Sequence, residues 1–237
     1  MSHNNPQELE YEGWTAIEDA VDDSAIVELS NHFQTSDNSN ANRHRNGKTF
    51  GIRNLLRNLA IIRQLAKSPA IRSLIEPVLG EDAIAVRGIL FDKTPDANWT
   101  VPWHQDLSIA VMQKHQMPGF GPWSVKAAVP HVQPPVHILQ SMLTVRLHLD
   151  DCGENNGPLL VIPGSHAHGV LSPSAVEEYR KSARSVACTV NRGGAVLMRP
   201  LLLHASHSAA SPAHRRVVHL EYAAGNLLPD PLRWFIA

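Results

Sequence analysis

The sequence predicts a mainly β fold with flanking helices, organised as a single domain over residues 1–237. After residue 80, short β-type runs follow one another with Gly- and Pro-containing turns between them, which is typical of an all-β sandwich or barrel. Before residue 80, apolar residues recur mainly at helical spacing, which indicates a helical flank beside a β core. The chain shows neither βαβ alternation nor a Gly-rich phosphate loop.

Residues 1–80 are expected to form the helical flank. Apolar residues at helical spacing predict helices over residues 18–33, 54–67 and 69–79. Pro69 separates the second helix from the third, and Gly80 stands where a C-terminal cap belongs. Residues 34–48 are rich in Ser, Asn and Asp, which predicts a mobile loop.

Residues 81–225 are expected to form the barrel core, with a short helix over residues 172–181. Strands are predicted at residues 83–91, 101–106, 142–150, 159–162, 185–190, 195–198, 201–204 and 216–223. The run at 142–150 alternates between two faces of its strand. One face carries Leu143, Val145, Leu147 and Leu149, and the other carries Thr144, Arg146, His148 and Asp150.

Residues 107–135 are rich in Pro, Gly and Trp and show no clear period. A loop of this length inside a compact domain is usually functional or disordered. We expect a lid over an active site, with Gly119 and Gly121 as hinges beside the bulky Phe120 and Trp123.

Charge and composition exclude several classes of protein. The net charge is −1, without the basic block that nucleic acids or anionic membranes attract. Residues 1–10 lack the apolar stretch of a signal peptide, and no apolar run approaches the ~20 residues that span a bilayer. We therefore expect a cytoplasmic protein with Cys152 and Cys188 as free thiols.

The segment Trp103-His104-Gln105-Asp106 carries the main chemical signal. Residues i and i+2 of a strand share one face, so His104 and Asp106 can offer an imidazole and a carboxylate to one metal ion. A facial iron(II) site needs one more histidine and leaves positions open for substrates. His204, at the end of an apolar run, is the candidate. Taken singly, a surface His–Asp pair and a buried core histidine are the plainer interpretations.

The metal hypothesis is supported by two further residues that follow His204 in the sequence. Ser206 follows at +2 and Arg215 at +11. An arginine can bind a carboxylate in bidentate fashion, and a hydroxyl adds one more hydrogen bond. Together they predict a carboxylate pocket one strand away from a metal ligand.

With these motifs the sequence resembles the phytanoyl-CoA dioxygenase family of iron(II)- and 2-oxoglutarate-dependent oxygenases. The matching segments are WHQD at 103–106, NNGPLLVIPGSH at 155–166, His204-Ala205-Ser206 and Arg215. The resemblance extends from about Arg87 to Tyr222. It implies a double-stranded β-helix, a jelly-roll or cupin-like barrel, with iron at its open end.

The resemblance also implies the roles of individual residues. His104, Asp106 and His204 would hold iron(II), and Arg215 and Ser206 would bind the distal carboxylate of 2-oxoglutarate. Arg87 and Arg146 would face the cosubstrate, and Arg216 is the rival to Arg215. Oxygen is the second cosubstrate, and ascorbate is an expected stimulant.

The implied reaction oxidises an unactivated C–H bond of a small-molecule metabolite and releases succinate and carbon dioxide. The carboxylate at Asp106 favours hydroxylation, because the family's halogenating relatives carry a small residue there. Candidates for lining the substrate pocket are Gln105, Trp103, Trp123 and Thr144, with ordinary packing as the alternative. The Trp- and Met-containing loop gives a mild preference for an apolar metabolite. The alternatives are a metal-binding barrel without 2-oxoglutarate turnover and a non-catalytic sensor, and the oligomeric state stays open.

Overall fold

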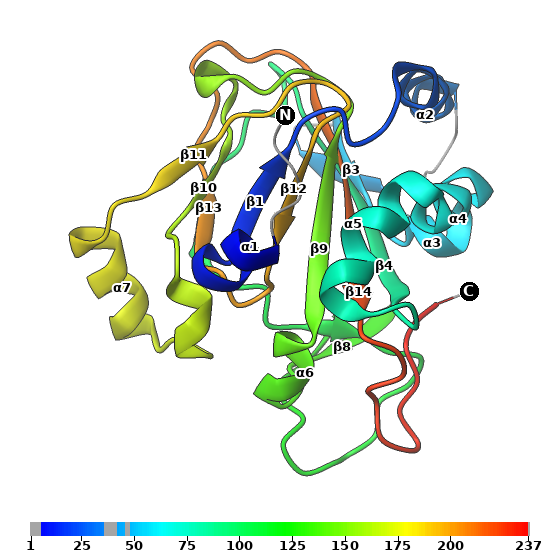
Figure 1. Cartoon of the computed structure of the whole chain (residues 1–237), viewed down its shortest axis with the longest axis vertical. Helices are drawn as coiled ribbons and strands as arrows, with labels where there is room; N and C mark the ends of the chain where they lie inside the picture. The colour runs from blue at the N-terminus through cyan, green and yellow to red at the C-terminus, as the bar shows by residue number, and fades with distance from the viewer. Residues whose placement is uncertain (1–5, 36–41, 46–47, 237) are drawn as a thin grey trace.

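The computed structural model describes residues 6–35, 42–45 and 48–236. Its strands form three antiparallel sheets (Figure 1). The large sheet has the order β1 (Trp14–Ile17), β12 (Ala195–Met198), β9 (Met142–His148), β14 (Arg215–Ala223), β4 (Ile84–Lys93), β3 (Lys48–Ile52) and β2 (Asn42–Arg45). The small sheet has the order β11 (Val186–Cys188), β10 (Leu159–Val161), β13 (His204–Ser206) and β5 (Val101–His104). The third sheet has the order β6 (Ile109–Ala110), β8 (Val129–Val132) and β7 (Trp123–Lys126).

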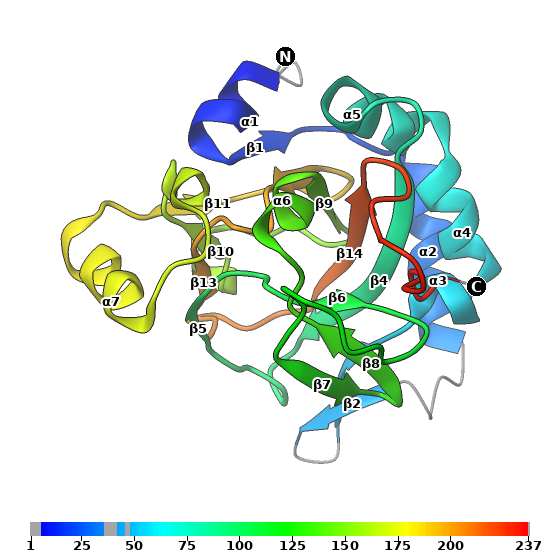
Figure 2. The ribbon, with the colours of Figure 1, turned by 90° about the horizontal axis from the view of Figure 1, so that it is seen from below.

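The helices lie outside the sheets, which confirms the predicted mainly β fold with flanking helices (Figures 1 and 2). They are α1 (Pro6–Glu12), α2 (Asp23–Thr35), α3 (Leu55–Asn58), α4 (Ala60–Lys67), α5 (Pro69–Leu79), α6 (Val136–Gln140) and α7 (Pro173–Ser182). None of the helices in the described part of the chain is long and apolar enough to cross a membrane.

The outer face of the large sheet packs against α2 to α5. Leu143, Val145 and Leu147 of β9 belong to the same apolar cluster as helical residues such as Ile62 and Ile71. Burying these apolar side chains on both layers is the main driving force that holds helices to sheet. The predicted alternation of β9 is thereby confirmed, except that Leu149 and Asp150 lie beyond the end of the strand.

The inner face of the large sheet carries polar side chains in cross-strand rows. The rows are Lys93 with Arg215, then Phe91 with Val217 and His148, then Ile89 with His219 and Arg146, and then Arg87 with Glu221 and Thr144. Each row is two residues from the next, so the first and last rows lie about 20 Å apart along the strands.

The first 80 residues are less uniformly helical than predicted, because β1, β2 and β3 all join the large sheet. The mobile loop predicted over residues 34–48 is wrong for β2 and for the start of β3, while 36–41 and 46–47 lie outside the described residues. An edge hairpin of polar composition lacks the apolar alternation that marks a strand. The helix predicted over 54–67 is interrupted at Leu59, whose backbone is extended (φ −124°, ψ 115°).

The segment over residues 107–135, which was predicted as a loop, contains regular strands. It forms the third sheet, whose strands are two to four residues long and are separated by Pro- and Gly-containing links. Figure 2 shows this sheet across one end of the space between the other two. The C-terminal segment is tied to it, because Phe235 N donates to Ala110 O at 3.1 Å. Whether the segment moves as a lid stays a prediction.

Candidate active site

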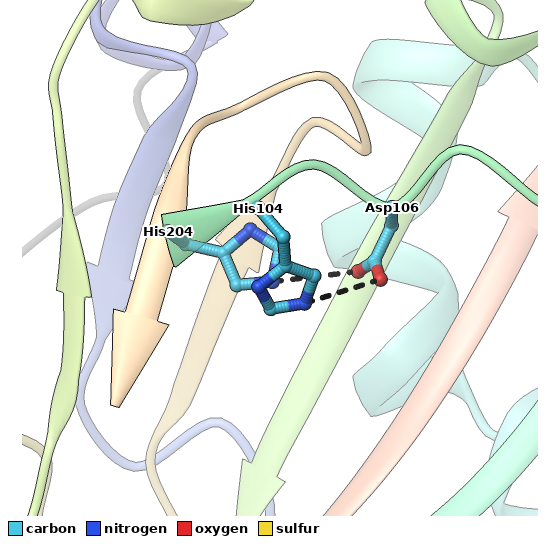
Figure 3. A group of neighbouring side chains, drawn as sticks. All are labelled: His104, Asp106 and His204. Atoms are coloured by element: carbon cyan, nitrogen blue, oxygen red, sulfur yellow. Dashed lines mark ion pairs between the residues drawn. The ribbon is translucent and has the colours of Figure 1, made fainter. Parts of the chain in front are cut away.

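The three predicted metal ligands come together between two neighbouring strands of the small sheet (Figure 3). His104 and His204 are direct cross-strand partners on β5 and β13. Asp106 follows β5 rather than lying on it, so the prediction that His104 and Asp106 share one strand is wrong. The backbone N–H of Asp106 donates to Pro200 O at 2.9 Å, which fixes the residue beside the two histidines. One ligand atom from each of the three side chains lies within 4.8 Å of the others.

Hydrogen bonds orient both imidazole rings for metal binding. His104 Nδ1 lies 2.8 Å from Pro102 O, and His204 Nδ1 lies 2.8 Å from Leu202 O. A carbonyl oxygen only accepts, so each Nδ1 carries the proton and donates it. Each Nε2 therefore presents a lone pair, and these atoms lie 3.9 Å and 3.7 Å from the Asp106 carboxylate oxygens. Such backbone partners are the usual means of holding a metal-binding histidine in one tautomer.

Burial and neighbouring charge hold His204 and Asp106 in the protonation states that a metal requires. Burial lowers the pKa of His204 to about 3, so the ring is neutral near pH 7. Burial alone would raise the pKa of Asp106, but the neighbouring histidines and Arg87 outweigh it and hold that pKa well below its usual range. Two imidazoles and one carboxylate on the same side suit a divalent transition metal.

The metal-binding group opens on a cavity of about 430 Å³ between the large and small sheets. His104 and His204 contribute from the small sheet, and Arg146 and Arg215 from the inner face of the large sheet. The cavity falls in the size range of small-molecule sites. We call the region of Lys93, Arg215 and Ser206 its inner end, and the region of Arg87, Glu221 and Lys126 its outer end.

The inner end is a cationic pocket in which two side chains donate hydrogen bonds to the same backbone carbonyl. Gly157 O accepts hydrogen bonds from Arg215 Nη1 and, at 3.1 Å, from Ser206 Oγ. Lys93 Nζ donates to Ser206 Oγ at 2.8 Å and also to the backbone carbonyl of His207. Gly157 has φ +61°, and a Cβ there would meet His207 O at 2.8 Å, so a glycine is required at this position.

Three basic side chains are buried in this part of the cavity wall, and two of them have an N–H group without a hydrogen-bond partner. Lys93, Arg146 and Arg215 are 0%, 7% and 3% exposed. Within the described residues, no acidic side chain forms an ion pair with any of them. The Nε atoms of Arg146 and Arg215 are buried without a hydrogen-bond partner. A buried guanidinium with an unused N–H is unfavourable, and an incoming carboxylate relieves it.

A chain of hydrogen bonds leads along the large sheet from Arg146 to the outer end. Arg146 Nη1 donates to His219 Nδ1 at 3.0 Å, so the proton of His219 is on Nε2. His219 Nε2 donates to Glu221 Oε1 at 3.2 Å, and Arg87 Nη1 donates to the same oxygen at 2.9 Å. His219 and Glu221, which the sequence did not single out as pocket residues, thus line the cavity.

The predicted substrate-pocket residues are mostly placed elsewhere. Trp103 alternates with His104 on β5, and neither it nor Thr144 or Trp123 lines the cavity. Trp123 instead packs against the apolar cluster beneath the third sheet. Gln105 does line the cavity, but its amide is occupied by backbone groups: Nε2 donates to Gly169 O and Leu201 O, and Oε1 accepts from Leu171 N.

The remaining candidates are used structurally. Arg216 forms an ion pair with Asp150 at 2.6 Å and does not line the cavity, unlike Arg215. His166, the last residue of the segment 155–166 that resembles the family, has its Nε2 3.1 Å from Glu10 O and so contacts helix α1. Cys152 and Cys188 are buried free thiols, as expected.

Several cavity residues were missed from the sequence. Arg53 precedes a predicted helix, and Ser108 and Lys126 come from the segment predicted as a loop. Lys93, which lies just beyond the predicted end of its strand, does not line the cavity itself but donates to Ser206, which does. Alternation along β4, once its full length is known, places Lys93 on the same face as Arg87.

Known proteins resemble this chain in sequence. A family model described as phytanoyl-CoA dioxygenase (PhyH) matches residues 9–217. The peroxisomal phytanoyl-CoA dioxygenase of Bos taurus is 26% identical over 175 residues, which are 67% of this chain and 44% of that protein. The Homo sapiens protein is 23% identical over the same shares of both chains. The chain therefore spans less than half the length of these curated relatives.

Solved structures resemble the chain over nearly its whole length. EctD from S. alaskensis, determined with 2-oxoglutarate and 5-hydroxyectoine, has a TM-score of 0.73 at 20% identity. The matched region covers 100% of this chain and 83% of the EctD chain. AviO1 from Streptomyces viridochromogenes has a TM-score of 0.68 at 21% identity, covering 98% and 100%. This likeness shows a shared fold, in agreement with the predicted jelly-roll class. Because the family model covers most of the chain, the protein belongs to the phytanoyl-CoA dioxygenase family.

Proposed function

We propose that this protein is an iron(II)- and 2-oxoglutarate-dependent oxygenase that oxidises a C–H bond of a small molecule and releases succinate and carbon dioxide. The observation that carries the proposal is the group of His104, Asp106 and His204, whose ligand atoms converge on one side of a cavity. Two histidines and a carboxylate are the donor set of non-haem iron(II) oxygenases. When bound, the iron supplies a centre at which 2-oxoglutarate and oxygen react together.

The inner end of the cavity supports the choice of cosubstrate. The distal carboxylate of 2-oxoglutarate would bind Arg215 and Ser206, with the unused Nε–H of Arg215 as one donor. Lys93 would act indirectly, because it donates a hydrogen bond to the hydroxyl of Ser206. The keto-acid end of 2-oxoglutarate would then face the three metal ligands. A metal-binding barrel that does not use 2-oxoglutarate has no need of a buried cationic pocket at this place.

The two further arginines predicted to face the cosubstrate receive different assignments. Arg146 lines the same cavity as the three metal ligands and has a buried Nε without a hydrogen-bond partner, so it can contact 2-oxoglutarate. Arg87 lies six residues along β4 from Lys93, about 20 Å from the inner end. It is therefore too distant to bind the same carboxylate as Arg215, and we assign it to the outer end.

Other parts of the proposal rest on the sequence. A carboxylate at position 106 favours hydroxylation as the outcome. A cytoplasmic location, oxygen as second cosubstrate and stimulation by ascorbate remain predictions of the same kind.

The direct test is succinate formation by the metal-free protein after addition of iron(II), ascorbate and 2-oxoglutarate, measured by mass spectrometry. We expect slow succinate release without prime substrate, and its loss in His204→Ala. His207→Ala is the matched control, because His207 is exposed three residues away and offers no ligand atom to the metal group.

Binding provides a second readout that does not depend on turnover. The wild-type protein should bind iron(II) without oxygen, and 2-oxoglutarate should then change the visible absorption of the complex. His204→Ala should lose both signals, while His207→Ala keeps them. Iron binding without any response to 2-oxoglutarate would instead favour a metal-binding barrel that does not use this cosubstrate.

A further inference from the structure

The outer end of the cavity holds cations that neither the metal nor the inner-end carboxylate uses. Arg87 comes from β4 and Lys126 from β7 of the third sheet, and both line the cavity beyond the metal ligands. Arg53, which precedes α3, lines the same region. Three segments that are distant in sequence thus bring positive charge to one place.

The guanidinium of Arg87 is fixed but only partly used. Its Nη1 donates to Glu221 Oε1 at 2.9 Å, and Glu221 is held in turn by His219. Within the described residues, this is the one hydrogen-bonded partner of Arg87. A guanidinium presents five N–H groups in a planar fork, so an edge remains available to a ligand.

Lys126 brings a second charge with open hydrogen-bonding positions. Its Nζ donates to Ser108 Oγ at 3.0 Å, which uses one of three donors. Burial, followed by the charges of Arg87 and Arg53, lowers the pKa of this lysine. The same two arginines act on buried His131, whose pKa burial and these charges lower to about 4. The outer end is thus a region of positive potential.

The charges of the proposed reactants do not remove this surplus. Among the described residues that line the cavity, the cationic side chains exceed the two carboxylates, Asp106 and Glu221, even when Arg53 is left out of the comparison: they are Arg87, Lys126, Arg146 and Arg215. Iron(II) and the 2-oxoglutarate dianion offset each other. A partly buried surplus of positive charge attracts an anion more strongly than the same charges do in water.

We propose that the outer end, through Arg87 and Lys126, binds an oxyanion on the prime substrate, so that the substrate is a small carboxylate or phosphate ester rather than a neutral apolar metabolite. The inference deepens the proposed function and rests on it. The anion at the outer end would hold the remainder of the substrate across the face of the metal group. Lys126 lies on the third sheet, so substrate binding would also fix that sheet over the cavity.

The test measures binding of short probes to the protein loaded with iron(II) and saturating 2-oxoglutarate in the absence of oxygen. The probes are hexanoate, hexyl phosphate and the neutral hexanamide, followed by isothermal titration calorimetry. We expect at least one anion to bind about tenfold or more tightly than hexanamide, since charge-assisted hydrogen bonds are the strong ones. Which anion binds better distinguishes a carboxylate from a phosphate substrate.

Variants locate the binding. Lys126→Gln should remove about tenfold of the anion affinity and leave hexanamide unchanged, whereas Lys126→Arg should retain the anion affinity. Lys114→Gln is the matched control, because Lys114 belongs to the same segment but lies over the Trp123 ring, outside the cavity. The affinity for 2-oxoglutarate should be the same in all of these variants.

The proposal is overturned if no anion binds better than hexanamide, if Lys126→Gln leaves anion affinity intact, or if it weakens 2-oxoglutarate equally. The last result would assign Lys126 to the cosubstrate. If 2-oxoglutarate itself does not bind, the proposed function fails, and the probes are then titrated into the protein alone. Hexanoate affinity that depends on Lys126 and not on Arg215 would still support an outer-end anion site, and dependence on Arg215 alone would reject it.

Discussion

Lys93 and Ser206 join the two main sheets, because Lys93 Nζ on β4 donates a hydrogen bond of 2.8 Å to Ser206 Oγ on β13. Lys93 is fully buried, and burial lowers its pKa to about 7, with the charges of Arg215 and Arg146 adding to the effect. The ammonium form is stable here only because a hydroxyl and a carbonyl oxygen accept hydrogen bonds from it.

This burial predicts a particular dependence of stability on pH. Between pH 7 and about 10.5 the unfolded chain holds the Lys93 proton and the folded chain releases it, so the contribution of this lysine to stability rises with pH. The unfolding free energy of the wild type, relative to that of Lys93→Met, should therefore increase from pH 7 to pH 9 by up to about 1.4 kcal/mol per pH unit. Urea unfolding of both proteins at pH 6 to 9 measures this, and parallel pH curves would contradict it.

Arg215 and Arg216 are expected to differ sharply in their effect on 2-oxoglutarate. Arg215 is buried with a free Nε–H beside the cavity, whereas Arg216 is paired with Asp150. Arg215→Gln should weaken 2-oxoglutarate binding by about 10- to 100-fold through loss of a charge-assisted contact. Arg216→Gln should change it by less than about threefold. Direct titration of 2-oxoglutarate into each metal-loaded variant decides, and equal losses would mean that the effect is one of folding.

The sequence predicts the fold best where the two faces of an element differ in polarity. Strand β9 was placed correctly because apolar side chains that face the helices alternate with polar side chains on the inner face, although both faces are buried. The edge hairpin of β2 and β3 and the short strands of the third sheet were missed. Pairing with neighbours, rather than an apolar pattern, makes such segments into strands.

The residues of the candidate site were also predicted only in part. The spacing of His104, Asp106 and His204 was informative because a strand pair and a short extension bring three donors together. Trp103 and Trp123 were chosen for their closeness in sequence to the ligands, but alternation along β5 and packing beneath the third sheet turn them away. Lys126 reaches the cavity only through the pairing of β7 with β8, which sequence spacing does not encode.

Gln105 is expected to act on stability rather than on substrate choice. Its amide makes hydrogen bonds of 2.8, 2.6 and 2.8 Å to three backbone groups around the metal-binding loop. Gln105→Leu leaves those groups unsatisfied and should lower the unfolding free energy by about 2–4 kcal/mol. Gln113→Leu, at an exposed position, should change it by less than about 0.5 kcal/mol. Urea unfolding measures both, and a Gln105→Leu variant of wild-type stability with altered substrate preference would reverse this assignment.

Metal binding should stabilise the folded chain, since the three ligands are together only after folding. His104 and Asp106 are separated from His204 by about a hundred residues, and β5 must pair with β13 to join them. A divalent metal at 100 times its dissociation constant would add about 2.7 kcal/mol, which raises the unfolding temperature by roughly 5–10 °C for a chain of this size. Asp106→Ala should lose this shift, whereas Asp230→Ala, at an exposed C-terminal position, should keep it. Thermal unfolding with and without iron(II) or a redox-inert substitute such as cobalt(II) under nitrogen makes the measurement. An equal shift in Asp106→Ala would show that the metal binds elsewhere and that the carboxylate is not a ligand.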